Sequence, residues 1–236
     1  MAPFSLWEGL SSLSHDLRPM ADTAARLYLV TPVLEDASFA PRIAEACGTG
    51  AVAAILLRLA FAEERRLINQ VKELAPVAQE HGAAVIVAVE GKEADLATIA
   101  ARGGADGVHV PGDPARVREL RERLKSERAI GVGAIRTKDD AMTLGEAGAD
   151  YLLFGEPRPD GSLPSLESVV ERASWWAEIF ETPCVAYAPS LDAVEPLAAT
   201  NAEFVALGDA VWTHAEGPAA AVKAAVAILE RQEASR

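Results

Sequence analysis

The chain has 236 residues, of which 50% are hydrophobic and 24% charged, a composition typical of a globular protein that buries one core. Its 35 acidic residues outnumber 22 Lys and Arg residues and give a formal net charge of −13. This charge repels nucleic acid and anionic membrane surfaces, so we expect neither as a partner. The apolar runs are too short to span a bilayer, and residues 1–25 lack the features of a secretory signal. We therefore expect a cytoplasmic protein.

The two cysteines, Cys47 and Cys184, lie in apolar segments far apart in the sequence. In a reducing compartment this arrangement predicts two buried free thiols, and a disulfide or a metal pair is the less favoured alternative.

Residues 1–25 are expected to form a helical extension ahead of a single domain at residues 26–236. Apolar side chains recur at every third or fourth position from Phe4 to Leu17, which predicts an amphipathic helix that ends at Pro19. This helix either closes the bottom of the domain or contributes to a homodimer contact. The adjacent Trp175 and Trp176 cannot both face the same side of a helix, so one of them is a second candidate for an exposed contact.

From Arg26 onward, short apolar segments alternate with longer segments of helical period. The predicted strands are Arg26–Pro32, Ala51–Arg58, Ala83–Glu90, Asp106–Val110, Ala129–Gly133, Asp150–Gly155, Pro183–Tyr187 and Ala202–Leu207. A helical segment follows each strand, the last over Glu216–Arg231. Continuous apolar strands are typical of a parallel sheet that is buried on both faces.

Glycines precede four of these strands, at Gly50, Gly82, Gly104 and Gly148. A glycine in the left-handed conformation is a common way to end a helix just before the next strand. Eight βα units with no long linker predict a single (βα)₈ TIM barrel, an α/β fold. An open doubly wound sheet is the alternative.

In a (βα)₈ barrel, ligand-binding and reactive groups lie at the carboxyl ends of the strands and in the loops that follow. Those positions carry Arg58, Glu90, His109, Asp113, Arg136, Glu156, Arg158, Tyr187, Ser190 and Asp209. They contain no Ser/His/Asp order and no phosphate loop of the Walker type. We expect a small-molecule ligand at this C-terminal face.

Four segments are similar in order and spacing to the thiamine phosphate synthase and TenI (thiazole tautomerase) family: Arg26–Pro32 (RLYLVTP), Gly107–Val110 (GVHV), Ile130–Val132 (IGV) and Gly148–Gly155 (GADYLLFG). The resemblance implies a transferase of thiamine biosynthesis on a TIM barrel. Such a synthase joins a hydroxymethylpyrimidine pyrophosphate to a thiazole phosphate and releases pyrophosphate, with Mg²⁺ on the leaving group. It also implies basic residues for the anion, carboxylates for the metal and backbone N–H groups for phosphate.

The resemblance assigns the ends of the second, third and fourth strands only in part. The family's Gln-x-Arg-x-Lys after the second strand reads Leu56–Ala60, so that only Arg58 survives as a cation. Its carboxylate cluster after the third strand leaves Glu90, and the loop after the fourth leaves Asp113. Glu90 and Asp113 are the implied Mg²⁺ ligands. Each has an alternative: Glu90 as the partner of Arg58 in an ion pair, and Asp113 as the N-cap of the following helix.

The resemblance also implies catalytic roles for Arg58, His109 and Arg158. His109 is either catalytic or a hydrogen-bonded core histidine. Arg158 replaces the family's Lys in the loop after the sixth strand, where a solvated turn is the alternative. The tautomerase's catalytic His is replaced by Ile135, whose alkyl side chain cannot transfer a proton.

The family's phosphate cup is the part most altered. It corresponds here to Ala188, Pro189, Ser190, Gly208 and Asp209. Proline has no N–H to donate, and alanine adds a Cβ where the backbone should approach the phosphate. A carboxylate at position 209 would repel a phosphate dianion.

Three hypotheses follow from the sequence. The chain is a Mg²⁺-dependent synthase of thiamine phosphate, or a barrel that binds a ligand or partner without turnover, or an enzyme that acts on a smaller or uncharged substrate. The replacements affect separate parts of one mechanism, so they weigh against efficient native catalysis.

Overall fold

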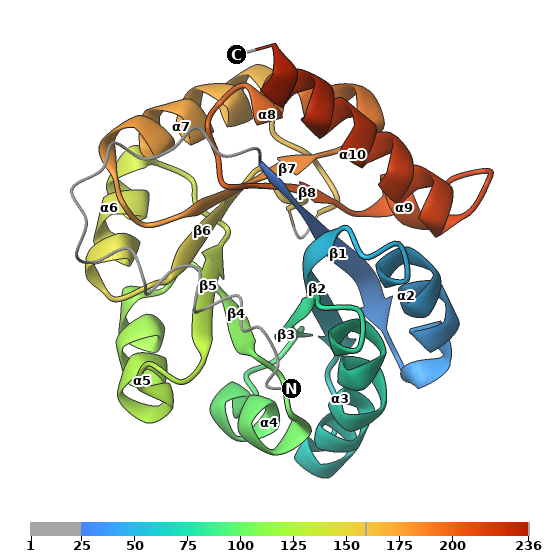
Figure 1. Cartoon of the computed structure of the whole chain (residues 1–236). Coiled ribbons are helices and arrows are strands. Elements are labelled where there is room, and N and C mark those ends of the chain that lie inside the picture. Colours follow the sequence, from blue (N-terminus) through green and yellow to red (C-terminus); the bar gives the residue numbers. More distant parts are fainter. Residues whose placement is uncertain (1–24, 159, 236) are drawn as a thin grey trace.

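A computed structural model describes residues 25–158 and 160–235 and shows eight parallel strands closed into a barrel, surrounded by helices (Figure 1). The strands follow one another in chain order from β1 to β8, and β8 pairs with β1 to complete the ring. The closed ring confirms the predicted (βα)₈ fold and excludes the open doubly wound sheet. The predicted amino-terminal helix lies outside the described residues, and its homodimer contact stays a prediction.

The strands are β1 (Arg26–Leu34), β2 (Val52–Ala60), β3 (Ala84–Glu90), β4 (Gly107–Pro111), β5 (Ala129–Gly133), β6 (Tyr151–Phe154), β7 (Cys184–Ala188) and β8 (Phe204–Leu207). The α-helices are α2 (Ala40–Cys47), α3 (Glu64–Gln79), α4 (Leu96–Gly103), α5 (Pro114–Leu124), α6 (Lys138–Glu146), α7 (Leu166–Ile179), α8 (Val194–Ala198), α9 (Asp209–Trp212) and α10 (Pro218–Ala234). Two short 3₁₀ helices, η1 (Ala37–Phe39) and η2 (Leu191–Ala193), lead into α2 and α8.

Both faces of the strands are buried, which explains their continuous apolar sequences. One buried cluster joins the outward faces of the strands to the helices. A second consists of strand residues that fill the inside of the barrel: Tyr28, Val30, Ala53, Ala54, Leu56, Ile86, Ala88, Tyr151, Leu153, Val185, Tyr187, Phe204 and Ala206. Side chains alternate across a strand, so residues in step with these, including Arg58, Glu90 and His109, also face the barrel axis.

The four glycines predicted before strands all have positive φ: 73° at Gly50, 83° at Gly82, 87° at Gly104 and 101° at Gly148. Gly104 is the C-cap of α4 and donates its N–H to Ala100 O at 3.0 Å. The left-handed conformation is accessible to glycine at low cost, so Gly104 ends its helix directly, while the other three glycines lie one or two residues beyond a C-cap and turn the chain toward the next strand.

The first two strands run beyond their predicted ends at Pro32 and Arg58, to Leu34 and Ala60. The pairing of β1 with β2 shifts register between Val30 and Val33, and it then resumes. This irregularity lets pairing continue past Pro32 and carries the strand pair further toward the mouth of the barrel.

Cys47 and Cys184 are buried free thiols, as predicted. Burial raises the pKa of the Cys47 thiol to about 12. Trp176 is buried and its indole N–H donates to Thr182 O at 2.6 Å, whereas Trp175 is half-buried, with the Lys138 amine 5.0 Å from its ring centroid. Within the described ranges, no helix has the length and apolar composition needed to cross a membrane.

Candidate functional site at the barrel mouth

Arg58 and Glu90 form an ion pair across the ends of β2 and β3. Arg58 Nε donates to Glu90 Oε1 at 2.8 Å, and the side chains remain 29% and 41% exposed. The Arg58 backbone N–H donates to the hydroxyl of the buried Thr31 at 3.0 Å, which fixes the end of β2 against β1. The pair expected from the sequence therefore forms, and its exposure leaves the guanidinium accessible at the mouth.

His109 belongs to a chain of polar side chains inside the barrel. Its Nδ1 lies 3.1 Å from the Tyr151 hydroxyl, which in turn lies 2.8 Å from the Tyr28 hydroxyl. On its other side, Nε2 lies 3.5 Å from Glu156 Oε2. Burial is the main cause of the raised pKa of both tyrosines, so both stay protonated at neutral pH. The hydrogen-bonded core alternative for His109 is therefore observed, in a series of contacts that ends at the half-buried Glu156 carboxylate, and its catalytic role stays a prediction.

Glu156 is held in place by the end of β5. The Ala134 N–H donates to Glu156 Oε1. Gly133 makes room for this carboxylate, because a Cβ at that position would lie 2.1 Å from Oε1. With 25% of its side chain exposed, Glu156 links the buried chain to the mouth.

Tyr187 faces the barrel axis from β7, and its hydroxyl lies against Gly208. A Cβ on Gly208 would be 2.5 Å from the Tyr187 hydroxyl oxygen. Burial raises the pKa of Tyr187 to about 12, and the carboxylates of Asp209 and Glu156 add to the rise, while the Arg58 guanidinium opposes it. Arg58 lies at the end of β2, Glu156 follows β6 and Asp209 follows β8. All three charges act on the Tyr187 hydroxyl of β7, so we treat these four strand ends as one region.

The residues of the predicted phosphate cup flank this region. Ala188 and Gly208 are buried, whereas Pro189, Ser190 and Asp209 are exposed. The short helix α9 is anchored by Trp212, whose indole N–H donates to Val30 O at 2.6 Å in β1. This contact fixes α9, and with it the backbone at Asp209, next to the end of β1.

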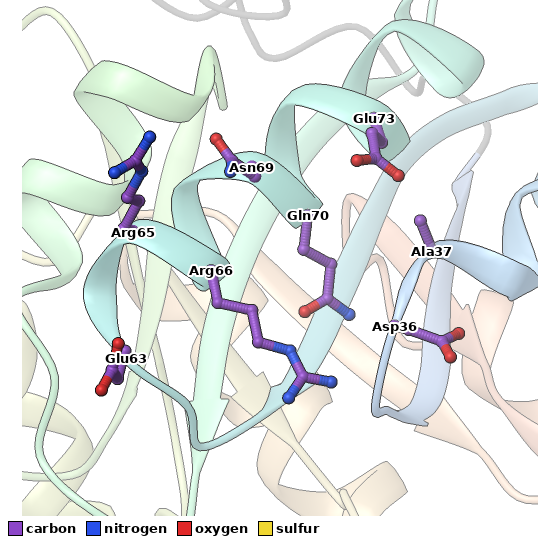
Figure 2. Close-up of a pocket in the computed structure, with 8 residues that line it drawn as sticks. All are labelled: Asp36, Ala37, Glu63, Arg65, Arg66, Asn69, Gln70 and Glu73. Carbon is purple, nitrogen blue, oxygen red and sulfur yellow. The ribbon is translucent and has the colours of Figure 1, made fainter.

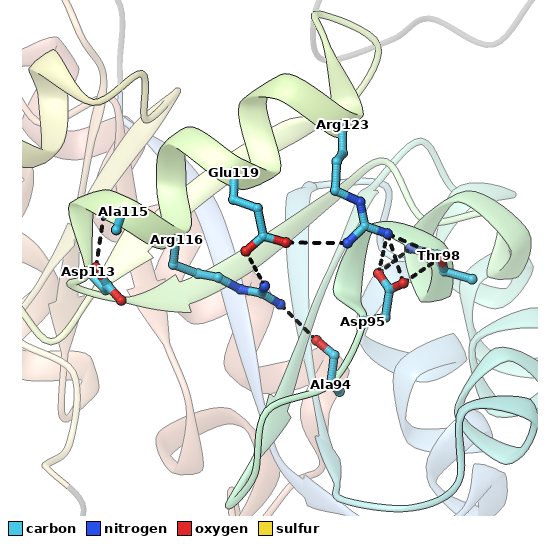
Figure 3. Close-up of polar contacts among 8 residues, drawn as sticks. All are labelled: Ala94, Asp95, Thr98, Asp113, Ala115, Arg116, Glu119 and Arg123. Atoms are coloured by element: carbon cyan, nitrogen blue, oxygen red, sulfur yellow. Dashed lines mark hydrogen bonds and ion pairs between the residues drawn. The ribbon is translucent and has the colours of Figure 1, made fainter.

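Asp113 caps α5 (Figure 3). Its carboxylate accepts a hydrogen bond from the Ala115 N–H at 2.9 Å. Arg116 and Arg123 of the same helix bind Glu119, and Arg123 also binds Asp95, the N-cap of α4. The capping alternative is therefore observed, and the role of Asp113 as a metal ligand stays a prediction. No cluster of three or more His, Cys, Asp or Glu side chains suited to a metal occurs among the described residues.

Arg158 lies in the loop between β6 and α7. Its guanidinium donates to the Ser162 hydroxyl at 3.2 Å, and its backbone N–H donates to Ser162 O at 2.8 Å. Burial is the main cause of the lowered pKa of Arg172, and the positive charge of Arg158 adds to it, so the two arginines lie near each other. The turn alternative is observed, and the role of Arg158 in anion binding stays a prediction.

A groove of about 370 Å³ lies on the outside of the barrel, between α3 and the segment around η1 (Figure 2). It is lined by side chains of both signs: Asp36, Ala37, Glu63, Arg65, Arg66, Asn69, Gln70 and Glu73. Two of these bind the loop after β1, since Arg66 donates to Glu35 O at 3.0 Å and Gln70 to Leu34 O at 3.3 Å. The groove contains none of the strand-end candidates, so we locate the site at the mouth.

Two groups at the mouth, Glu156 and Tyr187, appeared in the sequence only as polar residues at strand ends. Their partners, Tyr28 and Tyr151, appeared as core residues of apolar strands. The available signal was alternation: Tyr28 and Tyr151 occupy inward positions of their strands, where a hydroxyl needs a partner.

The closed barrel defines a TIM-barrel protein, and the charged side chains at its strand ends make the C-terminal face the candidate ligand site. Residues 27–211 match the family model described as thiamine monophosphate synthase. A thiamine-phosphate synthase of Rhodospirillum centenum is 37% identical over 203 residues, covering 85% of this chain and 95% of the relative. A thiamine-phosphate synthase of Hyphomonas neptunium is 34% identical over 227 residues, covering 89% of this chain and 99% of the relative.

Solved structures agree in fold. The thiamine phosphate pyrophosphorylase of Pyrococcus furiosus aligns with a TM-score of 0.70 at 23% identity, covering 88% of this chain and 96% of that one. A 3-hexulose-6-phosphate synthase of Salmonella typhimurium aligns with a TM-score of 0.68 at 18% identity, covering 88% and 99%. The chain belongs to the thiamine monophosphate synthase family.

Proposed function

We propose that this protein is a transferase of the thiamine-phosphate synthase type, which joins a hydroxymethylpyrimidine pyrophosphate to a thiazole and releases pyrophosphate at the barrel mouth. The observation that carries the proposal is the match to proteins named thiamine-phosphate synthase over 85% of this chain and 95% of the relative. The buried free thiols fit the reducing compartment in which we place the reaction, the cytoplasm.

Arg58 is the residue proposed to hold the pyrophosphate. It is a fixed cation at the barrel mouth, oriented by Glu90 through its Nε, so that its terminal nitrogens remain available for phosphate oxygens. Arg158 adds positive charge on the β6–α7 loop, and Arg172 adds positive charge from α7. Such cations stabilise the charge that develops on the leaving group as the C–O bond breaks.

Magnesium is proposed to bind through Glu90 and Asp113, which follow neighbouring strands β3 and β4. Each carboxylate uses one oxygen in a hydrogen bond, to Arg58 or to the Ala115 N–H, and within the described ranges the second oxygen of each is unengaged. Mg²⁺ commonly takes one or two carboxylates together with water and substrate phosphates, and Glu90 and Asp113 offer ligands of this chemistry. Bound there, Mg²⁺ would neutralise pyrophosphate charge.

A second function is favoured by the carboxylate and the proline at the ends of β8 and β7. Asp209 and Pro189 disfavour a phosphate dianion in the position where the family binds one. This observation supports either an enzyme of altered specificity or a barrel that binds its ligand without turnover. A turnover assay with both ring substrates separates these two alternatives.

Calorimetric titration with thiamine phosphate in the presence of Mg²⁺ and pyrophosphate tests the proposal. We expect saturable, micromolar binding that disappears in Arg58→Gln. The matched control is Arg102→Gln, since Arg102 pairs with Glu64 at 3.9 Å on the outer helices and should leave binding unchanged. No heat at millimolar thiamine phosphate and none with thiamine would contradict a site of this type.

A further inference from the structure

The hydroxyl of the buried residue Tyr187 faces the mouth of the barrel and has no hydrogen-bond partner among the described residues. Tyr187 is 5% exposed, yet its hydroxyl makes no hydrogen bond to any described residue. No unpartnered side-chain oxygen or nitrogen among the described residues is sealed from solvent, so the hydroxyl oxygen reaches the mouth. Water therefore pairs with this hydroxyl in the free protein, and a ligand hydroxyl that displaced the water could take over the same hydrogen bond.

The surroundings of this hydroxyl make it a donor. Its pKa is raised to about 12 by burial and by the Asp209 and Glu156 carboxylates, so Tyr187 keeps its proton at neutral pH. The two carboxylates are acceptors, and the Arg58 guanidinium is the one opposing charge that acts on the hydroxyl. The region therefore offers one neutral donor beside acidic acceptors.

The ends of β7 and β8 offer few groups that could bind an anion. The residue that follows β7 by one position is Pro189, which has no N–H, and α9 begins with the carboxylate of Asp209. A phosphate dianion placed beside Tyr187 would meet two like charges in a partly desolvated site. An uncharged hydroxyl group meets no such repulsion, and it can both accept from Tyr187 and donate to a carboxylate.

We propose that the ends of β7 and β8 form a subsite for the neutral alcohol arm of a ring substrate, with Tyr187 donating a hydrogen bond to the alcohol oxygen and Asp209 accepting a hydrogen bond from the alcohol O–H. The identity of the ring rests on the proposed function: the substrate is a thiazole alcohol in place of its phosphate. The bond changes are those of the synthase reaction, since the ring nitrogen–carbon bond forms, the carbon–oxygen bond to pyrophosphate breaks, and the arm stays intact. The product is thiamine.

Paired titrations test the subsite with thiamine and thiamine phosphate as probes, each with Mg²⁺ and pyrophosphate. We expect thiamine to bind at least about tenfold more tightly, as one well-placed hydrogen bond and the removal of repulsion predict. Equal or tighter binding of thiamine phosphate would overturn the subsite and leave the proposed function standing. If neither compound binds, both the subsite and the proposed function are overturned.

Variants identify the groups responsible. Asp209→Ser should raise affinity for thiamine phosphate about tenfold, whereas Asp192→Ser, which removes an exposed carboxylate after the neighbouring strand β7, should not. Tyr187→Phe keeps the ring and should weaken thiamine binding several-fold without changing thiamine phosphate binding. Equal effects of Asp209→Ser and Asp192→Ser would reduce the preference to overall charge and overturn the subsite. Thermal unfolding of each variant confirms that the barrel is intact.

Discussion

Asp209 and Pro189 occupy positions that the family resemblance assigns to a phosphate cup, where a hydroxyl and a backbone N–H are expected. Replacing both, in Asp209→Ser with Pro189→Gly, removes a like charge and restores a donor, so we expect the double variant to bind inorganic phosphate where the parent does not. A charge pair at about 4 Å costs about 1 kcal/mol in water and several in a drier site. Calorimetry with phosphate measures the gain. An intact double variant without phosphate binding would refute this explanation of the altered cup.

Gly133 and Glu156 are coupled by direct contact. In Gly133→Ala, the new Cβ would lie 2.1 Å from Glu156 Oε1, so the carboxylate must leave the Ala134 N–H and its place beside His109. Because the clash is with the end of a flexible, partly exposed side chain, the main cost is the lost hydrogen bond, and we expect a loss of about 0.5–1.5 kcal/mol in the free energy of unfolding. Urea unfolding measures it. The same alanine in a Glu156→Ala background should cost less than about 0.5 kcal/mol, and an equal cost in both backgrounds would exclude the contact as the cause.

At the scale of elements, Asp95 joins two helices. It caps α4 by accepting from the Thr98 N–H at 3.1 Å, and Arg123 of α5 donates to it at 2.7 Å (Figure 3). The hydrogen bond from Arg123 is the largest cause of the lowered pKa of Asp95, about 2 against an ordinary value of 3.8. A lowered folded pKa stabilises the fold above the unfolded pKa, and this stabilisation is lost as pH falls through about 2.

Asp95→Asn should therefore flatten the dependence of stability on pH between about 4 and 2. More than a third of the Asp95 side chain is exposed, so after allowance for solvent screening we expect an effect of about 0.5–1 kcal/mol. Chemical denaturation across this pH range measures it. Arg123→Gln removes the main partner and should flatten the curve in the same direction. If stability depended on pH in Asp95→Asn as it does in the parent protein, Asp95 would not be the source of this pH dependence.

The sequence predicted elements well where one strand or helix determines its own pattern. Eight apolar segments became eight strands, and Gly50, Gly82, Gly104 and Gly148 marked helix ends through their positive φ. The Arg58–Glu90 pair was predictable because two polar residues end adjacent inward-facing strand segments. The extension of β1 to Leu34 was not, because it depends on a register shift against β2.

The rest of the site depends on contacts between distant segments. His109 meets Glu156 only because the Ala134 N–H and the space above Gly133 hold that carboxylate across from β4. Tyr187 appears in the sequence only as a polar residue at the end of a strand, and its unpaired hydroxyl becomes visible only when Gly208, which follows the neighbouring strand β8, is placed against it. Contacts between side chains of different strands depend on how the sheet closes into a barrel, and the sequence pattern of a single strand does not specify this closure.

At the scale of the whole molecule, the net charge of −13 makes self-repulsion a term in stability. The Debye length is about 10 Å at 0.1 M salt, so added NaCl screens this repulsion over the whole surface. At pH 7 we expect the melting temperature to rise by roughly 2–5 °C between 0.02 and 0.3 M NaCl. The same titration near pH 4.8, where the net charge vanishes, is the control: salt there only weakens ion pairs and should leave the melting temperature unchanged or lower it. Calorimetric melting at both pH values decides the matter, because equal rises would mean that salt acts through hydration of the surface and not through the acidic charge.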